Sequence, residues 1–318
     1  MTATFATEPV QVSVVICAYN EQDAILPLLD SVRHALADMT YELIVVDDGS
    51  TDQTLTRLRQ QGGAPLTIVE LSRNTGQSAA MAAGLSLATG SFVATLDGDG
   101  QNDPADIPQL LRVAQSTGAD LVAGIRAKRQ DGWLLRRLPS QLANRLIRKL
   151  TGIDHPDFGC TLKLFTNDLV QRLPLYGDKH RFIPALAKAE GARMVSVPVM
   201  HHPRLTGQSH YGLGRIPRVL ADLVFMTYLI HYHNRPMHAA MRVLGTCLGI
   251  AGLGTLMTAS GAGYVGTWLI GAAGYVLLAS LLLGVAISAD LQLYRRYQSR
   301  TAQPFVIRRV YRKNPVPL

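Results

Sequence analysis

Short runs of β-branched and aliphatic residues alternate with amphipathic patterns along the first 125 positions of the chain. The runs predict strands, and apolar residues that recur every three or four positions predict helices. This alternating order is typical of an α/β domain in which a mostly parallel, Rossmann-like sheet is flanked by helices. The expected strands are residues 12–17, 43–46, 66–71, 92–96 and 121–123, and the expected helices are residues 25–37, 53–59, 78–87 and 107–114.

The pattern after residue 126 predicts contact with a membrane. Leucines at helical spacing lie among arginines and lysines between residues 134 and 150. They indicate a basic amphipathic helix, which lies either at a membrane surface or on the sheet with a solvated face. Residues 216–231 form a second amphipathic segment, expected along the membrane interface. Residues 243–289 contain no Asp, Glu, Lys or Arg, and this run of 47 residues is long enough for a C-terminal two-helix transmembrane hairpin.

The charge distribution and the search for a secretory signal predict where these parts lie relative to the membrane. The chain of 318 residues has a net charge of +8, and its basic residues gather at 126–149 and after the hairpin without any nucleic-acid-binding motif. Anionic membrane lipids and anionic substrates explain this excess, so no nucleic acid is expected as a partner. Basic residues after the second span, and no secretory signal, indicate a multi-pass protein of the inner membrane with a cytosolic catalytic domain. The expected divisions are the catalytic domain at 1–215, an interfacial helix at 216–236, the hairpin at 237–290 and a basic tail at 291–318.

Glycines in the expected hairpin suggest close helix packing. Gly245 and Gly249 form a Gly-x-x-x-Gly step, and Gly252 follows about one helical turn later. Small residues at this spacing allow helix backbones to approach each other in a membrane. The packing occurs either inside the hairpin or between copies of the chain in a homo-oligomer, and the pattern favours neither.

Polar loops follow several of the expected strands, at the sheet edge where ligands bind in parallel sheets. Asp97 and Asp99 are two positions apart in an extended segment, so both carboxylates can face one cation, with the amide oxygen of Gln101 beside them. Oxygen ligands suit Mg²⁺ or Mn²⁺, which would neutralise a diphosphate. An Asp-Gly-Asp also occurs in ordinary turns. A second acidic pair, Asp47-Asp48, ends another strand and favours a ligand site.

Nine short motifs occur in order along the chain. They are Ala18-Tyr19-Asn20-Glu21, Asp47-Asp48-Gly49-Ser50, Arg73-Asn74-Thr75-Gly76-Gln77, Asp97-Gly98-Asp99-Gly100-Gln101, Gly124-Ile125-Arg126, Arg136-Arg137-Leu138-Pro139-Ser140, Asp157-Phe158-Gly159-Cys160, Phe182-Ile183-Pro184-Ala185-Leu186-Ala187 and Arg204-Leu205-Thr206-Gly207-Gln208-Ser209-His210-Tyr211. The first four resemble the signatures of family-2 glycosyltransferases of the GT-A fold. The others resemble the polyprenyl-phosphate branch of dolichol-phosphate mannose synthases, Gtr-type bactoprenol glucosyltransferases and undecaprenyl-phosphate aminoarabinose transferases, of which the last group is nearest.

The resemblance implies a role for each matching residue, and it covers nearly the whole chain. Guanidinium groups suit a phosphate because they form paired hydrogen bonds with it, although surface charge is the plain alternative for adjacent arginines. By resemblance, the nucleoside is held by Tyr19, Glu21, Val46 and Asp48, the metal and diphosphate by Asp97, Gly98, Asp99 and Gln101, the lipid phosphate by Arg126, Arg136, Arg137 and Ser140, and the donor diphosphate is covered by Arg204, Ser209 and His210.

The implied reaction moves a sugar from a nucleotide-sugar donor, a UDP-sugar or less favourably GDP-mannose, to undecaprenyl or another polyprenyl phosphate. The acceptor needs little activation, because a phosphate monoester has a second pKa near 6 and is already a dianion at neutral pH. Alignment of the phosphate and stabilisation of the leaving group should therefore dominate catalysis. One in-line displacement inverts the anomeric centre.

Two other functions compete with this interpretation. A processive polysaccharide synthase would share the donor loops, but it needs a Gln-x-x-Arg-Trp motif that neither Trp133 nor Trp268 supplies. A catalytically silent membrane scaffold would keep the sheet and lose the chemistry, and the intact acidic motif argues against it. The chain also departs from the family, since Cys17 stands where many relatives have Pro and His210 where they usually have Lys. His210 would carry a positive charge only where nearby anions raise its pKa.

Overall fold

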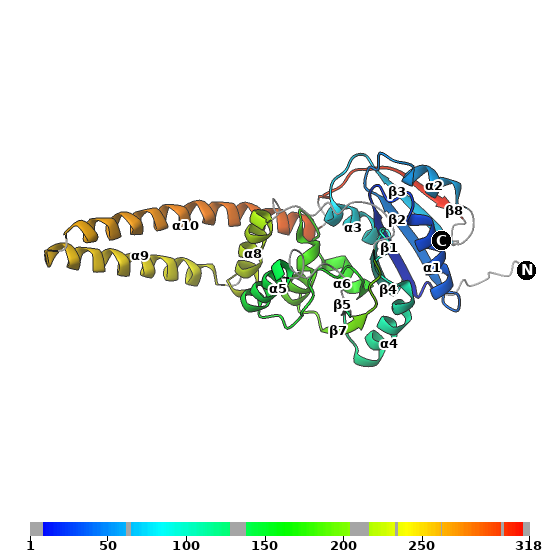
Figure 1. The fold of residues 1–318 in the computed structure, drawn as a ribbon, viewed down its shortest axis with the longest axis horizontal. Helices are drawn as coiled ribbons and strands as arrows, with labels where there is room; N and C mark the ends of the chain where they lie inside the picture. The colour runs from blue at the N-terminus through cyan, green and yellow to red at the C-terminus, as the bar shows by residue number, and fades with distance from the viewer. Residues whose placement is uncertain are drawn as a thin grey trace, which may run out of the picture. The chain divides into compact units, whose positions relative to one another are not determined.

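The computed structural model describes residues 9–61, 65–127, 138–203, 216–232, 235–261, 263–299 and 302–313. They divide into two compact units, whose elements are drawn in Figure 1. The sheet unit comprises Met1–Asp222 with Tyr297–Leu318, and the hairpin unit comprises Leu223–Arg296.

The sheet unit is built on one sheet of eight strands in the described part of the chain, in the order β7-β5-β6-β4-β1-β2-β3-β8. β6 runs antiparallel to β4 and β5, β8 runs antiparallel to β3, and the other neighbours pair in parallel. The strands are β1 (Val12–Ala18), β2 (Tyr41–Asp47), β3 (Leu66–Leu71), β4 (Phe92–Asp97), β5 (Leu121–Arg126), β6 (Lys163–Thr166), β7 (Met194–Val199) and β8 (Ile307–Lys313).

Helices follow most strands of the sheet, and the last two helices of the chain belong to the hairpin unit. In chain order they are α1 (Ile25–Ala35), α2 (Thr54–Gln60), α3 (Gln77–Leu85), the short 3-10 helix η1 (Pro104–Asp106), α4 (Ile107–Thr117), α5 (Leu138–Thr151), α6 (Asn167–Arg172), the 3-10 helix η3 (Lys179–Phe182), α7 (Ile183–Ala189), α8 (Ile216–His231), α9 (Pro236–Ala259) and α10 (Gly263–Gln298). The predicted α/β fold is confirmed, and every expected strand and helix of the first half is present.

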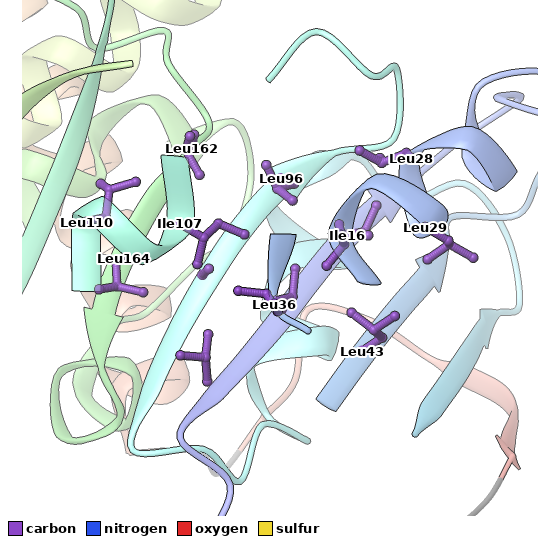
Figure 2. Packing of buried hydrophobic residues seen from close by; sticks show 14 of the residues in the cluster. Ile16, Leu28, Leu29, Leu36, Leu43, Leu96, Ile107, Leu110, Leu162 and Leu164 are labelled. Carbon is purple, nitrogen blue, oxygen red and sulfur yellow. The ribbon is translucent and has the colours of Figure 1, made fainter. Parts of the chain in front are cut away.

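The core lies on both faces of the sheet. On one face Ile16 of β1 belongs to an apolar cluster with Leu29 of α1 and Ile107 of α4, all three fully buried (Figure 2). On the other face α3 packs so closely that a Cβ on Gly84 would come within 3.0 Å of the Val46 side chain. Strands buried on both faces need continuous apolar sequences, which explains why β1 and β2 were readily predicted.

The hairpin unit contains two helices, α9 and α10, that are long and apolar enough to cross a membrane. A Cβ on Gly254 of α9 would lie 2.9 Å from the backbone oxygen of Gly266 in α10, so the two backbones approach closely there. A Cβ on Gly245, Gly249 or Gly252 would meet no other atom of the described residues within 4 Å. Close packing inside the hairpin is therefore the wrong interpretation of these three glycines, and their role in a homo-oligomer stays a prediction.

The segment expected as a basic tail belongs largely to regular structure. α10 continues to Gln298, and β8 adds an antiparallel strand to the edge of the sheet beside β3 (Figure 1). Glu70 of β3 accepts hydrogen bonds from Arg59 at 2.7 Å and from the Tyr311 hydroxyl of β8 at 3.0 Å. The prediction of a separate tail at 291–318 is wrong for this strand. Its basic residues hid the strand pattern, because an exposed edge strand tolerates charges that a central strand does not.

Candidate active site

The carboxyl ends of β1, β2 and β4 bring three polar loops to one edge of the sheet. β1 lies between the other two strands, so Ala18 pairs with Asp47 on one side and Cys17 pairs with Asp97 on the other. The two acidic motifs therefore emerge next to each other, with the end of β1 between them.

Hydrogen bonds join the loop after β1 to the loop after β2. The Asn20 backbone N–H donates to Ser50 Oγ at 3.0 Å, and Asn20 Oδ1 accepts from the Thr51 backbone N–H at 2.8 Å. Asn20 has a positive φ of 56°, a left-handed conformation that Asn adopts more readily than most residues. The two loops therefore form one connected wall of the site.

The predicted nucleoside residues differ in their access to a ligand. Tyr19 is 37% exposed at the edge of the sheet. The Glu21 backbone N–H donates to Thr54 Oγ1 at 2.9 Å, which fixes the start of the next turn. Val46 is fully buried, and its side chain packs beneath Gly84 of α3. The Val46 side chain therefore belongs to the core.

Asp48 and Asp47 are both buried and have different partners. Asp48 accepts three hydrogen bonds, from the backbone N–H and hydroxyl of Thr75 at 2.8 and 2.9 Å and from the Gly76 N–H at 2.9 Å. Burial raises the pKa of Asp48, and these bonds offset part of the rise. Asp47 Oδ2 accepts from the Ser50 N–H at 3.3 Å, while its buried Oδ1 has no hydrogen-bond partner among the described residues. A buried carboxylate oxygen left in this way is a candidate ligand contact, so Asp47 joins the site.

Asp97 accepts a side-chain hydrogen bond on each of its two carboxylate oxygens. Its Oδ1 accepts from Gln77 Nε2 at 2.5 Å, and its Oδ2 accepts from Thr161 Oγ1 at 2.9 Å. Thr161 is held in turn by Asn102, whose Nδ2 donates to Thr161 Oγ1 at 2.7 Å. Burial, and then the nearby charge of Asp99, raise the pKa of Asp97 to about 7. The structure therefore brings the carboxylates of Asp97 and Asp99 together where the sequence predicts a metal site.

The donor set fits a hard divalent cation. Asp97 is half-buried and Asp99 is buried, so their carboxylates repel each other, and a cation between them would relieve that repulsion. Asp99 is 5% exposed, and its Oδ1 accepts from the Gln101 backbone N–H at 3.1 Å. Among the described residues no three Asp, Glu, His or Cys side chains gather to hold a metal, so the remaining ligands would be the Gln101 amide, substrate oxygens or water.

Arg126 ends β5 and forms a two-point ion pair. Its Nε and Nη2 donate to the Asp157 oxygens at 2.7 and 2.6 Å, and its backbone N–H donates to Asp157 Oδ2 at 3.1 Å. Lys163 Nζ, fully enclosed nearby, donates to the Cys160 carbonyl. Burial lowers the pKa of Lys163. The predicted phosphate ligand Arg126 is thus oriented by a carboxylate that sequence reasoning had given no role.

The remaining predicted residues lie outside the described part of the chain. Five of them have no described position, and Ser140 lies in α5 without a described side chain. The five are Arg136, Arg137, Arg204, Ser209 and His210.

Short contacts lead from the site to the base of the segment that contains Arg204. Asn102 forms an isolated antiparallel bridge with His201, and the His202 N–H donates to the Gln101 carbonyl at 2.8 Å. His202 Nε2 also lies 2.9 Å from Asp103 Oδ2. Residues 201–203 are therefore fixed beside the acidic motif, immediately before the predicted covering loop begins.

A Rossmann-like sheet with an Asp-Gly-Asp motif after β4, beside a second acidic loop, has the arrangement of a GT-A glycosyltransferase. The chain belongs to glycosyltransferase family 2, because the family described as "Glycosyl transferase family 2" matches residues 13–173. The resemblance to the polyprenyl-phosphate branch is confirmed by curated relatives.

Two relatives and one solved structure show the range of similarity. The chain is 42% identical to dodecaprenyl-phosphate galacturonate synthase of Rhizobium johnstonii over 241 residues, 73% of this chain and 71% of the relative. It is 38% identical to undecaprenyl-phosphate 4-deoxy-4-formamido-L-arabinose transferase of Serratia proteamaculans over 223 residues, 68% of each chain. Glucosyl-3-phosphoglycerate synthase from Mycobacterium tuberculosis, in complex with Mn²⁺, uridine diphosphate and phosphoglyceric acid, shares the fold with a TM-score of 0.55 and 21% identity, covering 69% of this chain and 78% of that one.

Proposed function

We propose that this protein transfers a sugar from a nucleotide-sugar donor, with UDP-sugars favoured over GDP-mannose, to undecaprenyl or another polyprenyl phosphate. The observation that carries the proposal is the pair of half-buried Asp97 and buried Asp99 at the edge where the acidic loops meet. Two helices able to span a membrane lie in the same chain and suit a lipid acceptor. Relatives named for dodecaprenyl phosphate and undecaprenyl phosphate support this acceptor.

The donor would bind across the ends of β1, β2 and β4. Tyr19, Glu21 and Asp47 would contact the nucleoside, while Asp48 holds the loop at Thr75. Asp97, Asp99 and Gln101 would hold Mg²⁺ or Mn²⁺, and the fold relative crystallised with Mn²⁺ and uridine diphosphate supports this choice. Such an ion would neutralise the charge on the departing nucleoside diphosphate.

The acceptor would approach from the side of β5 and α5. Arg126 is already aligned by Asp157 and would contact the lipid phosphate, together with Arg136, Arg137 and Ser140. The phosphate dianion attacks the anomeric carbon directly, so no protein base is required. Inversion at that carbon follows from a single displacement. Arg204, Ser209 and His210 would cover the donor diphosphate and exclude water.

This reaction places the protein at the cytosolic face of the inner membrane. α9 and α10 would span the bilayer as a hairpin, because their apolar windows are only 11% and 6% buried within the fold. α8 would lie along the interface, next to anionic lipids. The anchor would keep the acceptor phosphate and the site at a high local concentration.

One experiment tests the function directly. Purified protein in detergent is incubated with undecaprenyl phosphate, Mn²⁺ and a panel of UDP- and GDP-sugars, and the lipid products are identified by mass. We expect one donor to give a lipid whose mass increases by one sugar residue, with nucleoside diphosphate released in equal amount. Asp99→Asn is the matched control for contaminating activity. Nucleotide binding without lipid product from any donor would refute the proposal.

A further inference from the structure

The polypeptide leaves the sheet unit after Asp222 and re-enters it at Tyr297. Both residues contact the same short segment before α7. Lys179 Nζ lies 3.6 Å from Asp222 Oδ1, and the Tyr176 ring centroid lies 4.9 Å from that of Tyr297. Lys179 Nζ also lies 3.8 Å from the centre of the Tyr176 ring, a cation–π contact. One segment of the sheet unit therefore holds the two points where the hairpin unit is attached.

An ion pair joins η3 to the first attachment point. Lys179 is 3% exposed, and a buried ion pair can often be replaced by apolar residues without loss of stability. A buried pair with a defined partner can instead fix one arrangement of two elements. The ion pair therefore suits a role in fixing Asp222, the first attachment point, against Lys179 of η3.

His180, the residue after Lys179, contacts Ser78 of α3 on the way to the active site. The His180 N–H donates to Ser78 Oγ at 3.0 Å, and His180 Nδ1 lies 3.0 Å from the same oxygen. Because Ser78 Oγ already accepts from the His180 N–H, its own proton is available to Nδ1. The hydroxyl donates to Nδ1 in the tautomer whose imidazole proton lies on Nε2. Both residues are buried, so this pair is shielded from water.

Ser78 lies in the first turn of α3, and that turn contacts both acidic motifs of the site. The residue before it, Gln77, donates from Nε2 to Asp97 Oδ1 at 2.5 Å. Gly76 donates its N–H to Asp48 Oδ2 at 2.9 Å. A shift of this turn would therefore move a hydrogen-bond donor away from each aspartate.

We propose that His180 and Ser78 are positioning residues that fix the first turn of α3, and through Gln77 the carboxylate of Asp97, relative to the attachment points of the hairpin. Neither residue touches the substrate. The contacts run from Asp222 and Lys179 to His180, then to Ser78 and Gln77, and end at Asp97. The proposal rests on the proposed function, since it concerns the carboxylate that serves the donor diphosphate.

Three substitutions of His180 separate positioning from simple packing. In His180→Asn the amide oxygen replaces Nδ1 as acceptor, so we expect kcat for lipid glycosylation to stay within about threefold of wild type. His180→Phe keeps the volume without the acceptor, and His180→Ala loses both, so each should lower kcat at least about tenfold. Thr151→Val is the control, because it also removes a buried hydroxyl hydrogen bond, to the Ile147 carbonyl, away from this path. Equal activity of the Asn and Phe variants would overturn the assignment of Nδ1.

A double-mutant cycle tests the connection itself and does not depend on the His180 variants folding. Asp222→Asn changes one end of the path and Gln77→Met changes the other. Effects of distant, independent substitutions normally multiply within about a factor of two. We expect each single variant to lower kcat and the double variant to lose at least about fivefold less than the product. Simple multiplication, or an Asp222→Asn variant with unchanged kcat, would refute the connection.

Nucleotide affinity separates failure of this proposal from failure of the proposed function. UDP with Mn²⁺ is titrated into wild type, His180→Asn and His180→Phe by calorimetry. Displacement of Asp97 should weaken UDP binding in the Phe variant alone, even if no sugar donor yields a lipid product. Wild type that binds UDP but transfers nothing would refute the function only, whereas equal UDP affinity in all three proteins would refute the positioning role.

Discussion

The ion pair between Arg126 and Asp157 allows the structural and functional roles of one arginine to be separated. Their side chains are 12% and 9% exposed, and two side-chain hydrogen bonds with one backbone bond join them. Asp157→Asn removes the counter-ion and leaves the guanidinium charge in place. The double substitution Arg126→Met with Asp157→Leu replaces the whole pair with apolar side chains.

The magnitudes follow from this burial. Removing one partner of a buried pair typically costs about 3–5 kcal/mol. Because Asn keeps one oxygen acceptor for Arg126, we expect the lower end for Asp157→Asn, about 3 kcal/mol of unfolding free energy, or roughly a hundredfold change in the unfolding equilibrium. Apolar replacement of both partners is often neutral, so the double variant should lie within about 1 kcal/mol of wild type.

Chemical unfolding in detergent measures the stability, and acceptor titration measures the function. If Arg126 binds the lipid phosphate, the double variant should raise KM for undecaprenyl phosphate at least about tenfold and leave UDP affinity unchanged. Arg148→Met is the control, since its partner Asp154 is 88% exposed and such pairs contribute about 0–1 kcal/mol. Wild-type stability of Asp157→Asn would refute the reasoning on burial, and a wild-type acceptor KM in the double variant would refute the role in binding.

Three further predictions concern separate parts of the fold. Asp99→Asn should lower transfer at least about a hundredfold without unfolding the protein, because an amide lacks the charge that a divalent ion requires; substantial turnover with metal present would contradict this. Burial lowers the pKa of His155 to about 4, so between its unfolded value near 6.5 and 4 only the unfolded chain takes up the proton, and stability should fall by roughly 3 kcal/mol as pH drops through that range. His155→Gln should remove this component from unfolding curves recorded between pH 4 and 7.5, whereas a stability difference from wild type that does not vary with pH would speak against it. Tyr311→Phe should cost about 1 kcal/mol through loss of its hydrogen bond to Glu70, while Val310→Ala on the same strand should change stability little, and equal effects would show that the hydroxyl contributes nothing.

The strands of the first half could be predicted because buried strands consist mostly of apolar residues. β1 and β2 are covered on both faces, so their sequences are mostly apolar. β6 could not be predicted in this way, because it has four residues and begins with the buried charge of Lys163. β8 was hidden by its arginines, which an edge strand tolerates. Short length and charge, rather than weak packing, explain these omissions.

The candidate site, too, could be predicted from the sequence only in part. The proximity of Asp97 to Asp48 follows from strand order and could be expected from the sequence alone. The partners of Asp97 could not, since Gln77 is 20 positions away and Thr161 is 64 positions away. Such contacts depend on how α3 and the segment before β6 pack against the sheet. The buried Val46 shows the converse, because it is the residue before the last in β2, beside the site, while its side chain fills the core.

The position of β8 has a consequence for how the protein is made. β3 ends at Leu71, but the strand that covers its outer edge begins at Ile307, after both apolar helices. At a synthesis rate of about 5–20 residues per second, roughly 10–50 s separate the two strands at the ribosome. During that interval the nascent sheet exposes an unpaired edge, which is open to misassembly with other chains. The sheet can therefore be completed by β8 only after the hairpin has been synthesised.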